Sequence, residues 1–198
     1  MPKTLILIPS RLAASRLPGK PLLKIDGLSI IFHVFKKAQQ SKIGEVYVCT
    51  GDKEIYDDVI NNGGKCILTS RDHKTGTDRI YEGFEKLNLL GTDYILNLQG
   101  DEPTINVEDI KKLNITATEN KSDLTTLACE LNSRKNLNEE NVVKVQTEKK
   151  LTLKKFSRAL KFFRKSSDLE SKNIYQHIGI YQYKASILKK FVKLNQTK

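Results

Sequence analysis

The sequence predicts an α/β fold, a three-layer, Rossmann-like α/β/α arrangement around a mostly parallel sheet, with a small β-rich second lobe. Short, fully apolar runs such as residues 3–9 are typical of strands buried inside a parallel sheet. Apolar residues at helical spacing follow each such run, and this alternation occurs four times between residues 1 and 120. From residue 121 to 198 strand-like runs follow one another directly, which favours a mixed sheet.

The elements of the first part follow from apolar patterning and from capping residues. Asp52 is expected to cap the second helix, and Gly63 with Gly64 to end it. Asn106 is expected to cap the fourth helix, with Asp109 at the capping-box position. The expected strands are 3–9, 45–50, 65–69 and 93–98, and helical spacing appears within 30–38, 55–60, 80–87 and after residue 106.

The second part carries weaker signals. Its expected strands are 124–131, 142–147, 151–157 and 174–183, and a short helix is expected over 187–192. The basic stretch 154–165 has a second interpretation, an amphipathic helix at a membrane surface. The two stretches 1–120 and 121–198 are expected to be parts of one domain.

The charge of the chain narrows the choice of partners. It has 198 residues, a formal net charge of +11 and 38% hydrophobic residues. Such a charge is compatible with nucleic acid, an anionic lipid surface or small anionic ligands. The lysines are spread along the chain, and neither a nucleic-acid-binding motif nor aromatic residues interleaved with a basic stripe accompany them. Nucleic acid is therefore not expected as a partner, and solvated lysines can account for much of the charge.

The cysteines and the apolar runs indicate the compartment. The three cysteines, Cys49, Cys66 and Cys129, are widely spaced, which argues against a zinc site and against disulfides. Cys49 and Cys129 lie in apolar runs and are expected to be buried thiols. The longest apolar run near the start, Leu5 to Ile8, is too short to span a membrane, and no signal-peptide pattern follows it. A cytoplasmic protein without a membrane partner is expected.

A loop rich in cations and hydroxyls, residues 9–21, follows the first strand. It carries Arg11, Ser15, Arg16 and Lys20. Backbone N–H groups and fixed cations can replace the water around phosphate oxygens, so this composition indicates a polyphosphate-binding loop. The loop has neither the Walker spacing nor the GxGxxG pattern, which argues against a P-loop kinase and a dehydrogenase. The alternative is a solvent-exposed loop that happens to be basic.

Two further loops follow predicted strands, and they are expected to lie at the same edge of the sheet as residues 9–21. Gly76 lies between Thr75 and Thr77 at a helix start and can present donors to an anion, although an ordinary helix cap explains the same residues. Asp101 follows Gly100 after the fourth strand, where a carboxylate can hold Mg²⁺ against nucleotide phosphates. The alternative for Asp101 is a turn in which it only caps backbone N–H groups.

Six segments carry a resemblance to a known family: RLPGKPL (16–22), TGTDR (75–79), QGDEP (99–103), NVVKV (141–145), FSR (156–158) and HIGIY (177–181). The chain resembles the CMP-Kdo synthetase (3-deoxy-manno-octulosonate cytidylyltransferase) family from Leu5 to about Lys193. The resemblance implies a nucleotide-diphospho-sugar transferase-like fold. It also implies a nucleotidyltransferase that moves CMP from CTP to the 2-hydroxyl of Kdo, releases pyrophosphate and activates Kdo for lipopolysaccharide biosynthesis. Two alternatives are a cytidylyltransferase for a sialic or pseudaminic acid type of sugar, and a non-catalytic CTP-binding remnant.

The resemblance further implies roles for individual residues. Lys20 and Asp101 are the expected catalytic residues, with Asp101 as a ligand of the cofactor Mg²⁺. Contacts with the acidic sugar are implied for Arg158, which offers a fork to a carboxylate, and for His177 and Tyr181. His73 is expected to be a surface residue without a role. Nucleotide contacts are implied for Arg11, Ser15, Arg16, Lys20, Thr75, Gly76, Arg79 and Gln99.

Two departures from the family pattern carry expectations of their own. After Arg158 the family continues with a loop that contains proline and tryptophan, whereas residues 159–164 read ALKFFR. The sequence stops at Lys198, before an E-Q-L-R-like helix and a V-D-T-P-E-D-like turn that holds the family's second metal-binding aspartate. The resemblance therefore implies a C-terminally truncated chain of uncertain activity. Residues 1–120 are its nucleotide-binding part and 121–198 its sugar-binding and dimerisation part, with a homodimer as one possible assembly.

Overall fold

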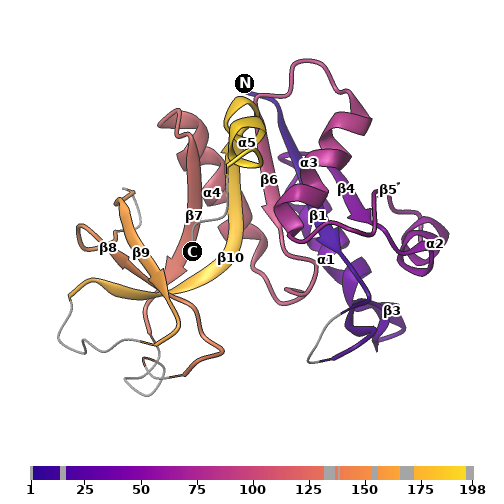
Figure 1. Ribbon diagram of the computed structural model, residues 1–198, viewed down its shortest axis with the longest axis horizontal. Helices are drawn as coiled ribbons and strands as arrows, with labels where there is room; N and C mark the ends of the chain where they lie inside the picture. Colours follow the sequence, from indigo (N-terminus) through magenta and orange to yellow (C-terminus); the bar gives the residue numbers. More distant parts are fainter. Residues whose placement is uncertain are drawn as a thin grey trace. The chain divides into compact units, whose positions relative to one another are not determined.

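The computed structural model describes residues 2–13, 17–131, 137, 139–152, 156–165 and 172–194 (Figure 1). The chain divides into two compact units, residues 1–125 together with 180–198, and residues 126–179. The division differs from the one expected at residue 120, because residues 180–198 join the first unit. Strand β10 (Ile174–Lys184) causes this, since its two ends pair with strands of different units.

The first unit is built around a sheet with β1 (Thr4–Ser10) at its centre. β1 lies between two parallel neighbours, β4 (Gly44–Thr50) and β6 (Tyr94–Leu98). β5 (Cys66–Leu68) continues the sheet parallel to β4, and residues 180–184 of β10 pair antiparallel with β6. The predicted, mostly parallel sheet is confirmed for this unit. Its four parallel strands end at one edge, where ligands bind in open α/β sheets.

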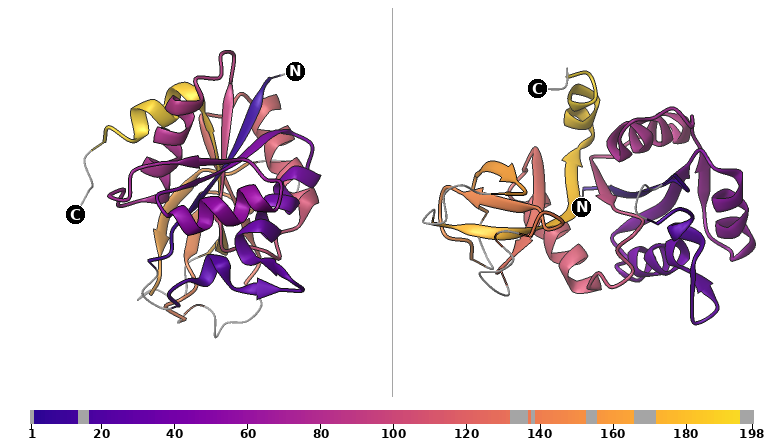
Figure 2. Two further views of the ribbon diagram at one scale, coloured as in Figure 1. Left: turned by 90° about the vertical axis from the view of Figure 1, so that its right-hand side faces the viewer. Right: turned by 60° about the horizontal axis from the view of Figure 1, so that its bottom comes forward.

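Helices cover both faces of this sheet (Figure 2). One face carries α1 (Ile30–Gln40), α2 (Lys53–Asn61) and α4 (Val107–Glu119). The opposite face carries α3 (Gly76–Leu87) and α5 (Ala185–Phe191). The α/β/α layering predicted from the strand–helix alternation is therefore present in the first unit.

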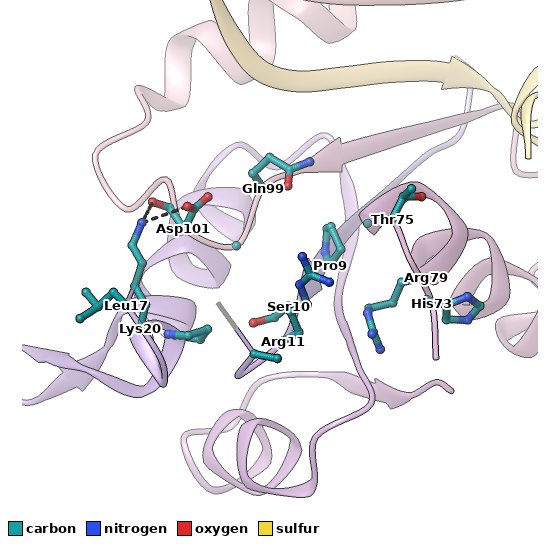
Figure 3. Close-up of a pocket in the computed structure, with 14 residues that line it drawn as sticks. Pro9, Ser10, Arg11, Leu17, Lys20, His73, Thr75, Arg79, Gln99 and Asp101 are labelled. Carbon is teal, nitrogen blue, oxygen red and sulfur yellow. Dashed lines mark hydrogen bonds and ion pairs between the residues drawn. The ribbon is translucent and has the colours of Figure 1, made fainter. Parts of the chain in front are cut away.

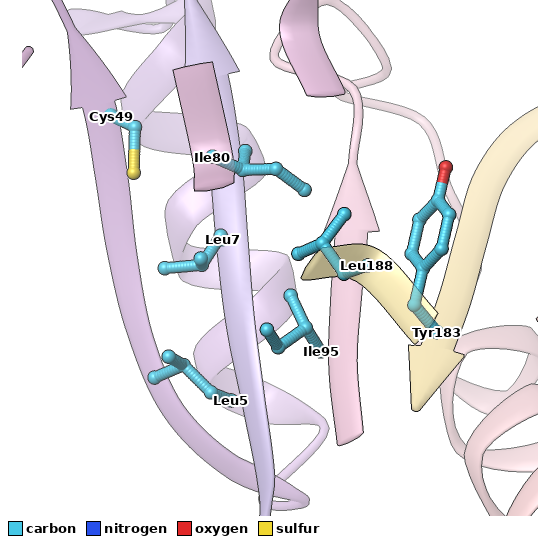
Figure 4. Packing of buried hydrophobic residues seen from close by; sticks show 7 residues of the cluster. All are labelled: Leu5, Leu7, Cys49, Ile80, Ile95, Tyr183 and Leu188. Carbon is cyan, nitrogen blue, oxygen red and sulfur yellow. The ribbon is translucent and has the colours of Figure 1, made fainter. Parts of the chain in front are cut away.

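Strand alternation decides which side chains meet which helices. Leu5 and Leu7 of β1 point to one face and pack in a buried cluster with Ile80 of α3 and Leu188 of α5 (Figure 4). Thr4 points to the other face, where its Oγ1 donates a hydrogen bond to Asn114 Oδ1 of α4 at 2.8 Å. Both faces of β1 are buried, which explains why Leu5 to Pro9 are all apolar.

The helix starts follow the predicted caps with one exception. Asn106 Oδ1 accepts a hydrogen bond from the backbone N–H of Glu108 at 2.9 Å, so the predicted cap of α4 is confirmed. Asp52 occupies the N-cap position of α2, but its side chain makes no bond to that helix. The predicted capping bond is therefore wrong. The carboxylate instead accepts the backbone N–H of Leu12.

A short hairpin in the first unit was not predicted. It consists of β2 (Lys24–Ile25) and β3 (Leu28–Ser29), joined by Asp26 and Gly27. Both turn residues have positive φ, 47° and 81°, as two-residue hairpin turns require. An Asp-Gly pair between apolar residues is a signal that could have indicated this turn.

In the second unit, β8 (Lys144–Thr147) pairs antiparallel with β9 (Ala159–Phe163) and with residues 174–176 of β10. β7 (Leu124–Cys129), which runs from the first unit into the second, pairs with β10. The strand predicted over 151–157 is wrong. Residue 152 forms only a bridge, residues 153–155 lie outside the described residues, and the strand is at 159–163. The alternative of an amphipathic helix over 154–165 is wrong for the same reason.

Two other expectations concern single residues and the membrane. Cys49 is buried as predicted, whereas Cys129 is exposed, so the prediction of a second buried thiol there is wrong. Cys129 is the last residue of β7, and the burial of that strand ends before it. Within the described part of the chain, no helix combines the length and the apolar character needed to cross a membrane.

Candidate functional site

A pocket of about 550 Å³ opens in the first unit where β1 and β6 end and α3 begins. In Figure 3, Lys20 and Asp101 lie at one end of the pocket, and Thr75, Arg79 and His73 lie at the other. Ser15 and Arg16 lie outside the described residues. The predicted residues that line the pocket are Arg11, Lys20, Thr75, Gly76, Arg79, Gln99 and Asp101.

Lys20 and Asp101 form an ion pair, with Lys20 Nζ 2.9 Å from Asp101 Oδ2. Lys20 begins a short 3₁₀ turn, η1 (Lys20–Leu22), directly after Gly19 with a φ of 71°. The two side chains are 33% and 55% exposed, so solvent screens their attraction. Exposed pairs of this kind contribute about 0–1 kcal/mol. An anionic ligand can therefore compete for the ammonium group of Lys20.

Gly100 fixes the turn that carries Asp101. A Cβ atom at this position would lie 2.8 Å from the carbonyl oxygen of Pro9 and 2.9 Å from Ile31 Cδ1. Real Cβ contacts are longer than this, so only glycine lets the turn lie against the end of β1. The close approach holds Asp101 and the loop after β1 at one edge of the sheet.

The opposite end of the pocket is formed by the start of α3. Thr75 is the N-cap, and its Oγ1 accepts the backbone N–H of Asp78 at 3.1 Å. Arg79 is only 3% exposed and donates to Thr69 Oγ1 at 2.7 Å and to the carbonyl of Ser70 at 2.9 Å. Burial lowers the pKa of Arg79, whereas the carboxylate of Asp52 opposes that effect. Arginine stays charged at neutral pH, so this end of the pocket is positive.

His73 also lines the pocket, and its side chain is 22% exposed. His73 is thus a partly exposed residue of the pocket wall. Its Nε2 contacts the carboxylate of Glu82, which also accepts the backbone N–H of Ser70 at 2.9 Å and pairs with Lys86 at 2.7 Å. Burial alone would raise the pKa of Glu82, but the hydrogen bonds from Lys86, Ser70 and His73 together lower it to about 2.

The depressed pKa of Glu82 predicts a pH-dependent contribution to stability. Its ionised form is favoured by folding, so the stabilisation is complete above the ordinary glutamate pKa of 4.5 and is lost as the pH falls toward about 2. We expect Glu82→Gln to lower the free energy of unfolding by about 1–2 kcal/mol at pH 7, and by about half of that or less at pH 3. Urea unfolding at both pH values measures this. Glu85→Gln on the exposed side of α3 is the control, and an equal loss at both pH values would contradict the prediction.

Ser10 is a pocket residue that the sequence did not single out. It is the last residue of β1, it is 6% exposed, and its buried Oγ finds no hydrogen-bond partner among the described residues. A buried hydroxyl without a partner is costly unless a ligand or water satisfies it. The position of Ser10 at the end of the central strand is the signal that could have identified it.

The three residues predicted to contact the sugar fall in different units. Arg158 and His177 belong to the second unit, and Tyr181 belongs to the first. Arg158 is exposed, and its backbone carbonyl accepts the N–H of Glu148 at 2.9 Å. Tyr181 pairs with Asn97 in the register of β10 and β6, and burial raises its pKa.

His177 sits in a defined environment within the second unit. Its Nε2 lies 2.9 Å from Thr126 Oγ1, and its ring meets the ring of Phe162 edge-on at 5.1 Å. Burial lowers the pKa of His177 and so favours the neutral imidazole. A neutral imidazole can donate one hydrogen bond and accept another, as recognition of hydroxyl groups requires.

Asp101 is the acidic residue among the described residues that line the pocket, so the protein would offer a metal ion one carboxylate there. Within the described part of the chain, no group of three or more His, Cys, Asp or Glu residues could hold a metal ion. Mg²⁺ prefers one or two carboxylates together with phosphate oxygens and water. The single carboxylate of Asp101, in the same pocket as Arg11 and Lys20, fits Mg²⁺ that arrives with a nucleotide.

Comparison with known proteins places the chain in a family. A family model described as cytidylyltransferase matches residues 5–198. The 3-deoxy-manno-octulosonate cytidylyltransferase of a Bradyrhizobium species is 41% identical over 198 residues, which cover 98% of this chain and 78% of that protein. The chain belongs to this cytidylyltransferase family. The family member from Brucella ovis is 39% identical over 193 residues, covering 97% of this chain and 76% of its own length.

Solved structures agree with this family assignment. The structure of CMP:2-keto-3-deoxy-manno-octonic acid synthetase complexed with CTP superposes with a TM-score of 0.86 at 35% identity, covering 98% of this chain and 79% of that chain. A 4-diphosphocytidyl-2C-methyl-D-erythritol synthase, at 15% identity and a TM-score of 0.64, shares the fold alone. The predicted family and the predicted α/β fold class are confirmed.

Proposed function

We propose that this chain transfers CMP from CTP to the 2-hydroxyl of Kdo and releases pyrophosphate. The observation that carries the proposal is the meeting of Arg11, Lys20 and Asp101 in one pocket at the edge of the sheet. The proposal is supported by the similarity to a synthetase that was solved with CTP. In this role the protein would act in the cytoplasm and supply activated Kdo for lipopolysaccharide biosynthesis.

The pocket offers different groups to different parts of CTP. Arg11 and Lys20 would balance the charge of the triphosphate, because fixed cations replace the water around phosphate oxygens. Gly76 would present its backbone at the start of α3. Gln99 carries an amide with both donor and acceptor atoms, which suits the edge of a base. Arg79, which is mostly buried, would hold the loop before α3 and keep this end of the pocket positive.

In the proposed reaction no covalent bond forms between the protein and a substrate. The 2-hydroxyl oxygen of Kdo bonds to the α-phosphorus of CTP, its proton leaves to solvent, and the bond from the α-phosphorus to the bridging oxygen of pyrophosphate breaks. Positioning and charge stabilisation therefore carry the rate. Lys20 would stabilise the negative charge that develops on the transferring phosphate. Mg²⁺ held by Asp101 would draw electron density from the phosphate oxygens.

Arg158, His177 and Tyr181 are proposed to recognise the sugar. A guanidinium group forms a two-point contact with a carboxylate, which suits the acid group of Kdo. A neutral His177 suits a sugar hydroxyl. These roles concern residues of two units, so each is best tested by its effect on KM for Kdo while KM for CTP is followed in parallel.

A pyrophosphate-release assay with CTP, Mg²⁺ and Kdo tests the proposed function. We expect release to require all three components, and mass spectrometry to identify CMP-Kdo as the product. Replacing Kdo by N-acetylneuraminate should lower the initial rate at least about 100-fold, because a pocket built for one set of hydroxyls leaves polar groups unpaired with another. Faster turnover with N-acetylneuraminate, or no release with Kdo, would contradict the proposal.

A further inference from the structure

The turn between β4 and α2, Gly51 with Asp52, contacts the loop predicted to bind phosphate. Asp52 is not among the residues that line the pocket. Its Oδ2 accepts the backbone N–H of Leu12 at 2.8 Å, one residue after Arg11. The carbonyl oxygen of Leu12 in turn accepts the N–H of Gly19 at 3.1 Å, one residue before Lys20. Leu12 therefore links the two ends of the loop through its bond to Gly19, and Asp52 is bonded to Leu12.

The turn itself is held rigidly. The backbone N–H of Asp52 donates to Thr50 Oγ1 at 3.1 Å, and Thr50 is fully buried at the end of β4. Arg71, from the loop after β5, donates from Nε to the carbonyl of Gly51 at 3.0 Å. A Cβ on Gly51 would lie 2.8 Å from the Cα of Arg71, so only glycine allows this approach. The loops after β1, β4 and β5 therefore meet at one small turn.

The charge of Asp52 is placed among cations. Its side chain is 19% exposed, and Arg71 Nε lies 3.9 Å from its Oδ1. Its field favours the charged form of Arg79, whereas burial and Arg11 oppose that form. A carboxylate this close to a phosphate-binding pocket would by itself repel an anionic ligand. The contribution that can be tested apart from this charge is the hydrogen bond that its Oδ2 accepts from Leu12.

We infer that Asp52 is a positioning residue of the nucleotide site. Through Leu12 it holds the two ends of the loop that carries Arg11 and Lys20, so that both cations face the pocket before CTP arrives. A site organised in advance loses less freedom on binding and so binds more tightly. The inference rests on the proposed function, because it assigns the loop to CTP. It adds a residue that does not line the pocket.

Two substitutions separate the hydrogen bond from the charge. Asp52→Ala removes the acceptor and the charge, whereas Asp52→Asn removes the charge and keeps an acceptor oxygen of the same reach. We expect Asp52→Ala to raise both KM and the dissociation constant for CTP about tenfold, with KM for Kdo unchanged within about twofold. We expect Asp52→Asn to stay within about threefold of wild type. Asp57→Ala, on the same helix and 46% exposed, is the control for loss of an acidic side chain.

Calorimetric titration of CTP into the full chain, pyrophosphate release and the thermal unfolding midpoint are measured on all four proteins. A merely structural role would lower stability without separating KM for CTP from KM for Kdo. The inference is overturned if Asp52→Ala binds CTP within twofold of wild type, or if Asp52→Asn is as weak as Asp52→Ala. Wild type that binds no CTP would overturn the proposed function and this inference with it. If wild type binds CTP and the Asp52 variants bind it equally well, the inference is overturned and the proposed function stands.

Discussion

Replacing Lys20 with alanine is expected to lower kcat for CMP transfer by about 10²- to 10³-fold, with a much smaller rise in KM for CTP. Lys20 lies at the end of the pocket where Asp101 also lies, and its side chain is 33% exposed, so a phosphate can reach it. A donor aimed at charge that develops only during the reaction stabilises the transition state more than the bound substrate. The loss should therefore appear mainly in kcat.

Steady-state pyrophosphate release with saturating Kdo measures the effect of this substitution. Lys24→Ala is a suitable control, because Lys24 is exposed on the adjacent hairpin and lies outside the pocket lining. Thermal unfolding should show little change, since the ion pair with Asp101 is exposed and contributes about 0–1 kcal/mol. Turnover equal to that of wild type would refute the role assigned to Lys20.

Replacing Asp101 with asparagine is expected to lower the Mg²⁺-dependent rate by about 100-fold or more. Asparagine keeps the size of the side chain but removes the negative charge that Mg²⁺ requires of its protein ligand. The substitution also removes the ion partner of Lys20. CTP binding without Mg²⁺ should therefore be as tight as in wild type or tighter, because one repulsive charge is gone and Lys20 is released.

The dependence of pyrophosphate release on Mg²⁺ concentration, measured beside CTP binding in its absence, tests both halves of this prediction. Glu108→Gln serves as the control, because Glu108 is an exposed acidic residue in an ion pair with Lys111 on α4. A variant with the Mg²⁺ response of wild type would show that Asp101 is no ligand. Weaker CTP binding without Mg²⁺ would instead assign Asp101 a structural role in the turn.

Sequence patterning predicted the centre of the first unit well because β1 and β6 are buried on both faces. Residues 4–8 of β1 are apolar apart from Thr4, and such a short apolar run, rich in isoleucine, is typical of a strand in a parallel sheet. In the second unit β9 could not be located in this way. Leu160 and Phe162 on β9 are 53% and 48% exposed, so burial imposes no alternation on that strand.

The site residues likewise divide into those that nearby sequence indicates and those that depend on long-range contacts. Arg11, Lys20, Gly76 and Asp101 could be chosen from the sequence, because cations, glycine and a carboxylate directly after apolar strands indicate phosphate and metal chemistry. Asp52 was assigned to a helix cap, and its bond to Leu12 bridges 40 positions of the chain. No local pattern distinguishes a carboxylate that caps its own helix from one that turns to a neighbouring loop.

Apolar periodicity predicts the α/β class and short polar motifs carry the resemblance to the family, because both are local properties of the chain. Long-range packing, in contrast, decides that residues 180–184 join the sheet of the first unit and that Asp52 reaches the loop after β1. Each of these depends on which distant segments pack side by side. Which segments pack together depends on the burial of whole apolar faces of the sheet and helices, and no single stretch of residues specifies it.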